Sequence, residues 1–241
     1  MIVEDTVQGS HVRSFHQLTP CVSADTILNI IVASKDGKLP KGLAHAPPHR
    51  LILDSTPGWA VSCNAALARA AAFGGDVLFL DDDVELTEGC LDRVFSHYSH
   101  ADLFGLDLHD MEGKRQVGAR HVLTNEGALV DWVESGPAYV AHVSTSAIYI
   151  KEKALGLRFP IWKGLHYEDF HFCLNAWLQG FKVLAVPGLV RHAIVSGVGS
   201  TKRTDPLFWQ RWMANKETFE YWARTKQVFE QGIVPIGAKG L

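Results

Sequence analysis

Residues 76–83 read Asp76-Val77-Leu78-Phe79-Leu80-Asp81-Asp82-Asp83, an apolar run that ends on three successive carboxylates. The apolar part predicts a buried strand. Adjacent carboxylates repel one another, so a strand that ends on three of them needs compensation. A divalent cation such as Mg²⁺ or Mn²⁺ would supply it, because both prefer oxygen ligands. The other interpretation is a solvated turn whose acids complement the dipole of the next helix.

The spacing of these acids gives them different directions. Alternate residues of an extended chain face the same way, so Asp81 and Asp83 would point into one site and Asp82 elsewhere. A metal held by the first two would bridge a diphosphate and stabilise its charge as it departs.

The first half of the chain alternates between strand and helix patterns. Apolar, β-branched runs predict strands at 26–33, 50–54 and 76–80, and helices are expected at 61–73 and 88–96. Gly74-Gly75 would end the first helix, and Thr87 would be the N-cap of the second. This order predicts an α/β fold with a Rossmann-like, mostly parallel central sheet flanked by helices.

Acidic residues follow several of these strands. Ligands of open parallel sheets bind beyond the carboxyl ends of the strands. Asp36, Asp54 and the triple Asp all stand at such ends. We therefore expect them to share one site.

The second half is expected to complete the same sheet and to add a C-terminal helix. We predict strands near 101–104, 138–141, 146–151 and 181–186, a helix at 170–179, and a long tail helix from 205 to about 229. Pro187-Gly188 would stop the last strand, leaving 189–192 short and extended.

Composition favours one domain. The four cysteines are scattered without a CxxC pair, which argues against a disulfide or zinc scaffold and favours the cytosol. No apolar run approaches the roughly 20 residues of a membrane span, so we expect no transmembrane helix. Peripheral association with the inner membrane is the alternative to a purely cytosolic location. An acidic pI, about 6.4, gives no general attraction to nucleic acid. We divide the single domain 1–241 into a tail or peripheral segment (1–24), a first half (25–100), a second half (101–200) and a C-terminal helix and tail (201–241).

Two further motifs carry chemistry, each with a plainer alternative. Glu168-Asp169 opens a helix, where acids often only complement the dipole, but the aromatic neighbourhood would suit a general base. His192 stands beside the Gly/Ser stretch 196–200, where it is either structural or a metal ligand.

Taken together, these stretches resemble the family-2-type glycosyltransferases of GT-A fold, which carry an Asp-x-Asp metal motif. The resemblance covers about residues 26 to 222. It rests on the order and spacing of Leu51–Asp54, Ser62–Ala70, Val77–Leu86, Tyr167–Pro187, Arg191-His192 and the tail helix Asn215-Lys216-Glu217-Thr218-Phe219.

The resemblance implies that residues 25–100 form the nucleotide-sugar-binding half and residues 101–200 the acceptor and catalytic half. It also implies a role for each matching position. Ser34, Asp36 and Asp54 would line the nucleotide pocket together with Asn64, Asp81 and Asp82, the last near the ribose. Asp83, Asp81 and His192 would hold Mn²⁺ or Mg²⁺. Asp169 would be the general base, and Glu168 would position it or the acceptor. The reaction would be an inverting transfer from a nucleotide-diphosphate sugar, UDP-hexose being favoured, to a hydroxyl of a glycan, a lipid-linked or another acceptor.

The chain also departs from the family pattern. The stretch between the first two strands is short and Pro-rich, and His171 stands where relatives often carry a second Asp. Leu207 stands upstream of Arg211-Trp212 at the position where processive relatives carry glutamine, so we expect non-processive addition. A nucleotidyltransferase, a non-catalytic nucleotide-sugar or glycan binder, and an enzyme acting on modified DNA are the alternatives.

Overall fold

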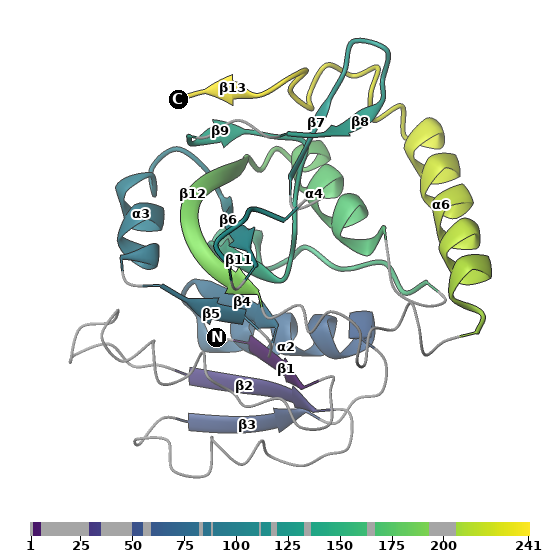
Figure 1. Cartoon of the computed structure of the whole chain (residues 1–241). Coiled ribbons are helices and arrows are strands. Elements are labelled where there is room, and N and C mark those ends of the chain that lie inside the picture. Colours follow the sequence, from purple (N-terminus) through teal and green to yellow (C-terminus); the bar gives the residue numbers. More distant parts are fainter. Residues whose placement is uncertain are drawn as a thin grey trace.

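The structure is a computed structural model (Figure 1). It describes residues 2–5, 29–34, 50–54, 59–81, 84–87, 89–110, 112–116, 120–132, 136–162, 167–192 and 206–241. In the strands 2–5, 29–34 and 50–54, and at His192, the backbone alone is described.

The described elements are thirteen strands, four α-helices and one short 3-10 helix. The helices are α2 (Trp59–Phe73), α3 (Cys90–Ser96), η3 (Glu152–Ala154), α4 (Glu168–Leu178) and α6 (Phe208–Thr225). The strands are β1 (Ile2–Asp5), β2 (Asn29–Ser34), β3 (Arg50–Asp54), β4 (Val77–Asp81), β5 (Val84–Leu86), β6 (Leu103–His109), β7 (Arg120–Leu123), β8 (Leu129–Asp131), β9 (Ala138–Tyr139), β10 (His142–Val143), β11 (Ala147–Ile150), β12 (Val183–His192) and β13 (Lys239–Gly240).

Ten strands form one mixed sheet in the order β13-β9-β12-β6-β11-β4-β1-β2-β3, with β5 attached to β12. The strands β3, β2, β1 and β4 are parallel, as the sequence predicts for the first half. Beyond them, β11 runs antiparallel between β4 and β6, and β12 is parallel to β6. A second sheet, β10-β7-β8, is wholly antiparallel. The predicted α/β architecture with a C-terminal helix is confirmed, but the main sheet is mixed rather than mostly parallel, because β5, β9, β11 and β13 pair antiparallel with their neighbours.

Two hydrophobic layers cover the main sheet. Alternate residues of β4 face opposite sides, as the period of a strand requires. Phe79 packs in the layer that contains α2, α4 and α6, whereas Leu78 and Leu80 pack with α3. Figure 1 shows α3 and α6 at opposite sides of the molecule.

The N-terminal residues correct one expectation. Residues 1–24 were expected to form a tail or peripheral segment, but Ile2–Asp5 is the strand β1, inserted between β2 and β4. The expectation failed because four residues carry no readable period, and their pairing partners lie far along the chain. Thr87 was expected to be the N-cap of the helix that follows it, but the N-cap of α3 is Gly89, with φ 72°.

The strand β12 does not stop at Pro187-Gly188 as expected. It continues to His192, with its pairing to β6 shifted between Val186 and Val190. Proline lacks the N–H that a regular ladder needs, so an irregularity at this point is the natural result. The shift allows the end of β12 to pair with β5.

A glycine allows the second sheet to approach the first. A Cβ atom at Gly105 of β6 would lie 2.2 Å from Cβ of Val143 on β10. No side chain fits in that space, so β10 packs directly on the backbone of β6. The adjacent residue of β10 is His142, which is fully buried.

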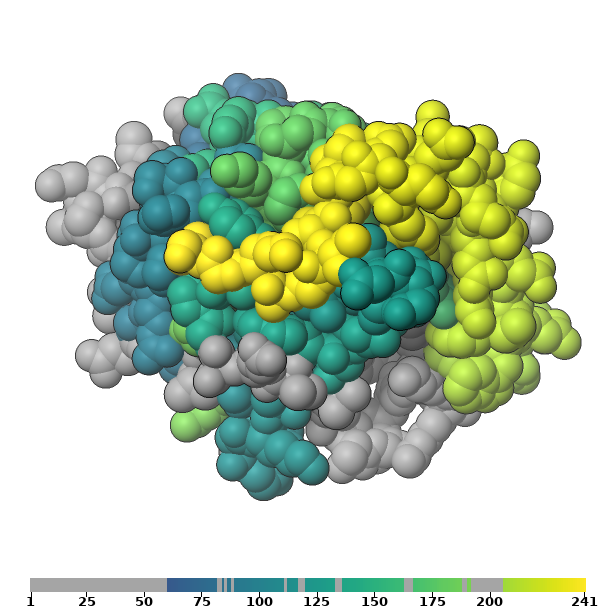
Figure 2. Space-filling view, turned by 90° about the horizontal axis from the view of Figure 1, so that it is seen from above, coloured from purple at the N-terminus to yellow at the C-terminus, as the bar shows by residue number. Residues whose placement is uncertain are grey.

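The C-terminal segment covers the β7–β8 hairpin. Ile236 forms a bridge with Leu123, and the N–H of Gly237 donates to the carbonyl of Leu123 at 2.7 Å. Figure 2 shows this segment, in yellow, lying across the face beside the teal hairpin. The hairpin is therefore held between β10 and the end of the chain.

Replacing Gly105 with alanine is expected to lower the free energy of unfolding by about 1–3 kcal/mol, the usual effect of overpacking a core. Urea denaturation followed by circular dichroism measures the change. Gly156→Ala is the matched control, because nothing lies within 4 Å of a Cβ at that position. An unchanged midpoint for Gly105→Ala would contradict the close contact of β10 with β6.

Candidate functional site

Several predicted site residues lie at one edge of the main sheet. In the parallel strands, Asp5 pairs with Ser34, Ala33 with Asp54, and Glu4 with Asp81. Strand ends that are parallel and in this register lie at the same edge. The structure thus brings Ser34, Asp54 and Asp81 to one edge, as predicted. Asp36, which was expected beside them, lies outside the described residues.

His192 comes to the same region by a different route. Its backbone pairs with Val84 of β5, the residue that directly follows Asp83 in the chain. Neighbouring strands lie about 5 Å apart, so this pairing places the His192 backbone next to the end of the acidic run. Asp82 and Asp83 themselves lie outside the described residues.

The first residue of the acidic run, Asp81, ends β4 in a partly buried position. Its N–H donates to the carbonyl of Ser146 at 2.9 Å. Ser146 directly precedes β11, so this bond continues the pairing between β4 and β11. Among the residues whose side chains are described, no group of three or more His, Cys, Asp or Glu is placed to hold a metal. The expected ligands Asp83 and His192 fall outside that set.

The amide of Asn64 on α2 is hydrogen-bonded to the backbone of Phe159. Its Nδ2 donates to the Phe159 carbonyl at 2.9 Å, and the Phe159 N–H donates to its Oδ1 at 2.8 Å. These two bonds fasten the segment before α4 to α2, which is a structural role. Contact of Asn64 with a donor stays a prediction.

The acid pair lies in the first turn of α4, as predicted. The helix begins after Tyr167, whose φ of 67° is rare for a residue with a side chain. Glu168 is buried, at 4% exposure, whereas the side chain of Asp169 is 28% exposed. Of the two carboxylates, Asp169 is therefore the one that solvent or a substrate can reach.

Asp169 is paired with a buried histidine. Oδ2 of Asp169 lies 3.1 Å from Nε2 of His142, and Oδ1 accepts from the N–H of Phe170 at 2.9 Å. Burial alone would raise the pKa of Asp169. The adjacent His142 and the Phe170 N–H outweigh it, so the pKa of Asp169 lies below the usual value for aspartate.

A second histidine supports the first. His121 on β7 lies opposite His142 on β10, and their Nδ1 atoms are 3.0 Å apart. Burial, followed by the nearby His142, lowers the pKa of His121 to about 4, so His121 is neutral at physiological pH. The ring of Phe170 stacks on His142 with centroids 4.0 Å apart and planes inclined by 9°.

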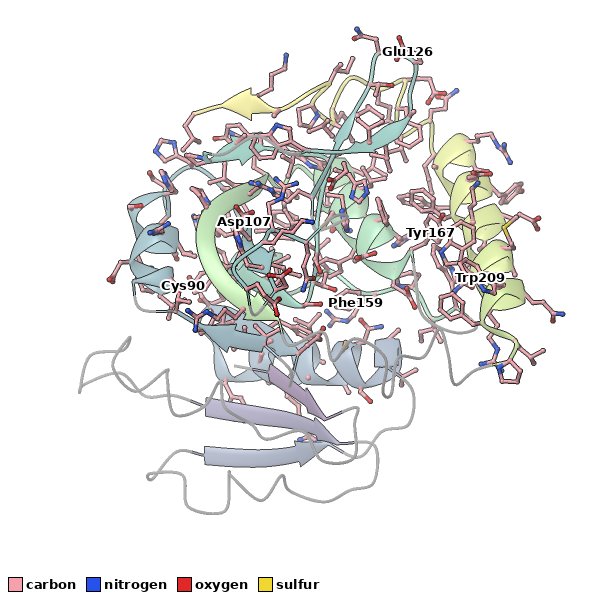
Figure 3. All side chains as sticks on the ribbon, viewed as in Figure 1. Cys90, Asp107, Glu126, Phe159, Tyr167 and Trp209 are labelled. Carbon is pink, nitrogen blue, oxygen red and sulfur yellow. The ribbon has the colours of Figure 1, made fainter. Side chains whose placement is uncertain are left out.

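A buried ion pair fixes the strand that carries His121. Nε of Arg120 lies 3.0 Å from Oδ1 of Asp107 on β6, and the guanidinium lies 4.3 Å from the ring centre of Trp132. Burial raises the pKa of Asp107, and Arg120 acts in the opposite direction. Figure 3 shows Asp107 in the interior, near the middle of the molecule.

Aromatic contacts hold the start of α4 against α6. The ring of Tyr167 lies 5.5 Å from those of Trp212 and Phe219. Figure 3 shows Tyr167 between the two helices and Trp209 on α6. The backbone strain at Tyr167 is thereby offset by packing, and the first turn of α4 is held in place.

Three residues of the region were missed by the sequence analysis. Asp5 was assigned to a tail, and neither His121 nor His142 was singled out. His121 follows Arg120 in a four-residue strand and His142 stands in a strand of two residues, and neither lies within a recognisable motif. Their pairing arises from the register of two short strands, which no local pattern records.

A scan against protein-family models finds none that matches the chain, and a search of curated proteins finds no similar sequence. The part of the chain that the structure describes contains no helix long and apolar enough to cross a membrane.

Solved structures of three proteins share the fold. The chain is 14% identical to GalNAc-T7, crystallised with UDP, GalNAc and Mn²⁺, over 80% of this chain and 43% of that one (TM-score 0.55). TarS of S. aureus is 16% identical over 80% of this chain and 36% of that one (TM-score 0.59). The mannosyltransferase PcManGT of Pyrobaculum calidifontis, in complex with GDP-Man and Mn²⁺, is 15% identical over 82% of this chain and 57% of that one (TM-score 0.54).

These neighbours are glycosyltransferases of GT-A type, and the present chain spans between 36% and 57% of their lengths. Likeness at such low identity shows the fold and not the activity. The chain therefore has the α/β fold of the GT-A glycosyltransferases.

Proposed function

We propose that the protein is a metal-dependent glycosyltransferase that moves a sugar from a nucleotide-diphosphate sugar to an acceptor hydroxyl. The observation that carries the proposal is the pairing of His192 with Val84, beside the acidic run at the carboxyl edge of β4. This pairing joins a histidine and the Asp cluster, which lie far apart in sequence, within a GT-A fold. The neighbours crystallised with UDP or GDP-Man and with Mn²⁺ support it.

The residues at this edge fit a divalent cation. Carboxylates with one imidazole suit Mn²⁺, and carboxylates alone suit Mg²⁺. In the proposal Asp83, Asp81 and His192 hold the ion. When bound, it would neutralise charge on the donor diphosphate and on the departing nucleoside diphosphate.

The donor nucleotide would bind along the ends of β2, β3 and β4. Ser34, Asp36 and Asp54 line the base and ribose side of the pocket in this proposal, with Asp82 near the ribose and Asn64 and Asp81 completing it. A UDP-linked hexose is the favoured donor. One neighbour was crystallised with UDP and another with GDP-Man, so the thermal-shift experiment below compares both kinds of donor.

Asp169 would act as the general base. It is the exposed member of the acid pair and is ionised over a wider pH range than an ordinary aspartate. In the reaction, the O–H bond of the acceptor breaks and its proton passes to the carboxylate of Asp169. The acceptor oxygen bonds to the anomeric carbon, and the bond from that carbon to the diphosphate breaks, with inversion. Glu168, buried behind Asp169, would position it.

The acceptor is a glycan, a lipid-linked or another hydroxyl compound, and addition would be non-processive. A nucleotidyltransferase would share an acidic metal site but lacks support, because Ser34-Lys35-Asp36-Gly37-Lys38 is only faintly like its Gly-rich basic loop. A non-catalytic binder would not need Asp169 to be both exposed and paired with a histidine.

Asp83→Ala is expected to abolish the stabilisation of the protein by a nucleotide sugar with Mn²⁺. Thermal shift with UDP-glucose, UDP-GalNAc and GDP-mannose, each with and without Mn²⁺, measures this. In the native protein one donor class should raise the Tm, and only with the metal. Asp110→Ala, which removes an exposed carboxylate on a different turn, is the control. Metal-independent stabilisation would contradict the assigned metal site.

Asp169→Asn is expected to bind that donor normally and to lose about 10²–10⁴-fold in kcat, the usual contribution of a general base. Release of nucleoside diphosphate, with water or sugar as acceptor, measures the rate. Retained transfer would show that Asp169 is not the base. Donor binding without turnover in the native protein would favour the non-catalytic binder.

A further inference from the structure

Two histidines outside every assigned motif, the buried His142 and the partly buried His121, lie beside Asp169. His142 is fully buried, and its ring is fixed on three sides. Phe170 stacks on its face at 4.0 Å, its Nδ1 lies 3.0 Å from Nδ1 of His121, and its Nε2 lies 3.1 Å from Asp169. A ring held in this way has no freedom to turn away from the carboxylate.

We propose that His142 is a positioning residue for Asp169 and that His121 in turn holds His142 in its orientation. The proposal rests on the proposed function, since it assigns a task to the pair only if Asp169 is the base.

The hydrogen positions follow from the partners. An ionised Asp169 can only accept, so Nε2 of His142 must carry the proton that faces Oδ2. Between the two Nδ1 atoms, one must donate and the other accept. A neutral His142 with its proton on Nε2 has a bare Nδ1, which accepts from Nδ1–H of His121, whereas donation from Nδ1 of His142 would require the doubly protonated imidazolium. In both cases the proton on Nε2 is on the side of Oδ2 of Asp169.

The two carboxylate oxygens of Asp169 are both held. Oδ2 contacts His142, and Oδ1 accepts the N–H of Phe170 at 2.9 Å. Each oxygen retains a further lone pair, and the side chain is 28% exposed. An acceptor hydroxyl can therefore reach a carboxylate whose direction is set from the buried side.

The same contact keeps Asp169 ionised. His142 lowers its pKa against the effect of burial. The other titratable groups that act electrostatically on Asp169 or on the two histidines are Asp131 on β8 and Cys173 on α4, and Tyr167, Glu168 and His171 are neighbours along the start of α4. Asp131 is itself paired with Arg115 at 3.4 Å, so its charge is partly compensated.

The lowered pKa of Asp169 determines how activity changes with pH. A lowered pKa keeps the base ionised in neutral and mildly acidic solution, and activity falls only as pH drops through that low value. Without His142, burial still raises the pKa of Asp169 and the main opposing partner is gone. The acid limb of the kcat/KM profile must then move to higher pH.

The test compares His142→Phe with His142→Gln in the full chain. The phenyl ring keeps the stacking on Phe170 but has no donor, whereas the glutamine amide can place a donor near the position of Nε2. His142→Phe should lower kcat at least about 10-fold, within the range that loss of a general base allows. It should leave donor affinity with Mn²⁺ unchanged and shift the acid limb upward, and His142→Gln should recover part of kcat.

His171→Phe is the matched control. His171 is a partly buried histidine of α4, two residues after Asp169, and its ring packs against Trp162 and Trp222. The His171→Phe variant should leave the acid limb of the pH profile where it is and change kcat by no more than a few fold. His121→Phe should act in the same direction as His142→Phe but less strongly, and the two effects should not add, because both act through one contact.

A measurement without turnover separates this proposal from the proposed function. Carbon-13 NMR of the Asp169 carboxyl should show a pKa below that of ordinary aspartate in the native protein and a higher value in His142→Phe. If the shift occurs but no donor is turned over, the proposed function fails and the contact stands. If Asp169→Asn abolishes transfer while His142→Phe alters neither kcat, the acid limb nor the carboxyl pKa, the positioning role is overturned.

Discussion

The structure depends on the hydrogen bonding of one long strand. β12 pairs with β6 along its length, with β9 on its other edge, and with β5 at its end. Figure 1 shows that β12 is strongly curved. The register shift around Pro187 supplies the bend, and Nη1 of Arg93 donates to the Pro187 carbonyl at 2.8 Å. The meeting of His192 with the acidic run follows from this bend.

The position of His121 and His142 beside Asp169 depends on packing between the two sheets. The absence of a side chain at Gly105 lets β10 lie against β6, and the buried Arg120–Asp107 pair ties β7 to the same strand. Removing one partner of such a pair would leave an uncompensated buried charge, so the pair fixes the relative position of the strands more than it adds stability. His121 and His142 are carried to α4 by these two contacts.

The sequence predicts what is local and misses what is not. The strand 50–54 and the helix ending at Gly74 show clear apolar periods and appear as predicted. β1 was missed because its sequence, Ile-Val-Glu-Asp, is short and half polar, and only its neighbours β2 and β4 make it a central strand. The acid pair was predicted because a helix start has a local pattern.

The histidines behind that acid pair could not be predicted in the same way, because each stands in a strand of only two to four residues without a motif around it. Such a residue is more often structural than functional, and only the contact with Asp169 distinguishes it. The register of two-residue strands such as β10 is set by tertiary packing, here the contact of Val143 with Gly105, and not by hydrophobic alternation.

In the proposed reaction, a base near a diphosphate faces an electrostatic difficulty. The negative charge of the donor would raise the pKa of any nearby carboxylate, and so would burial. A carboxylate that became protonated as the donor bound could not accept the proton of the acceptor. His142 opposes both effects from the buried side, where it does not obstruct the acceptor. The cost is a weaker base, since a lower pKa means less affinity for the proton. Such a base suits a displacement in which departure of the diphosphate runs ahead of proton transfer, because the acceptor hydroxyl becomes more acidic as its bond to the sugar forms.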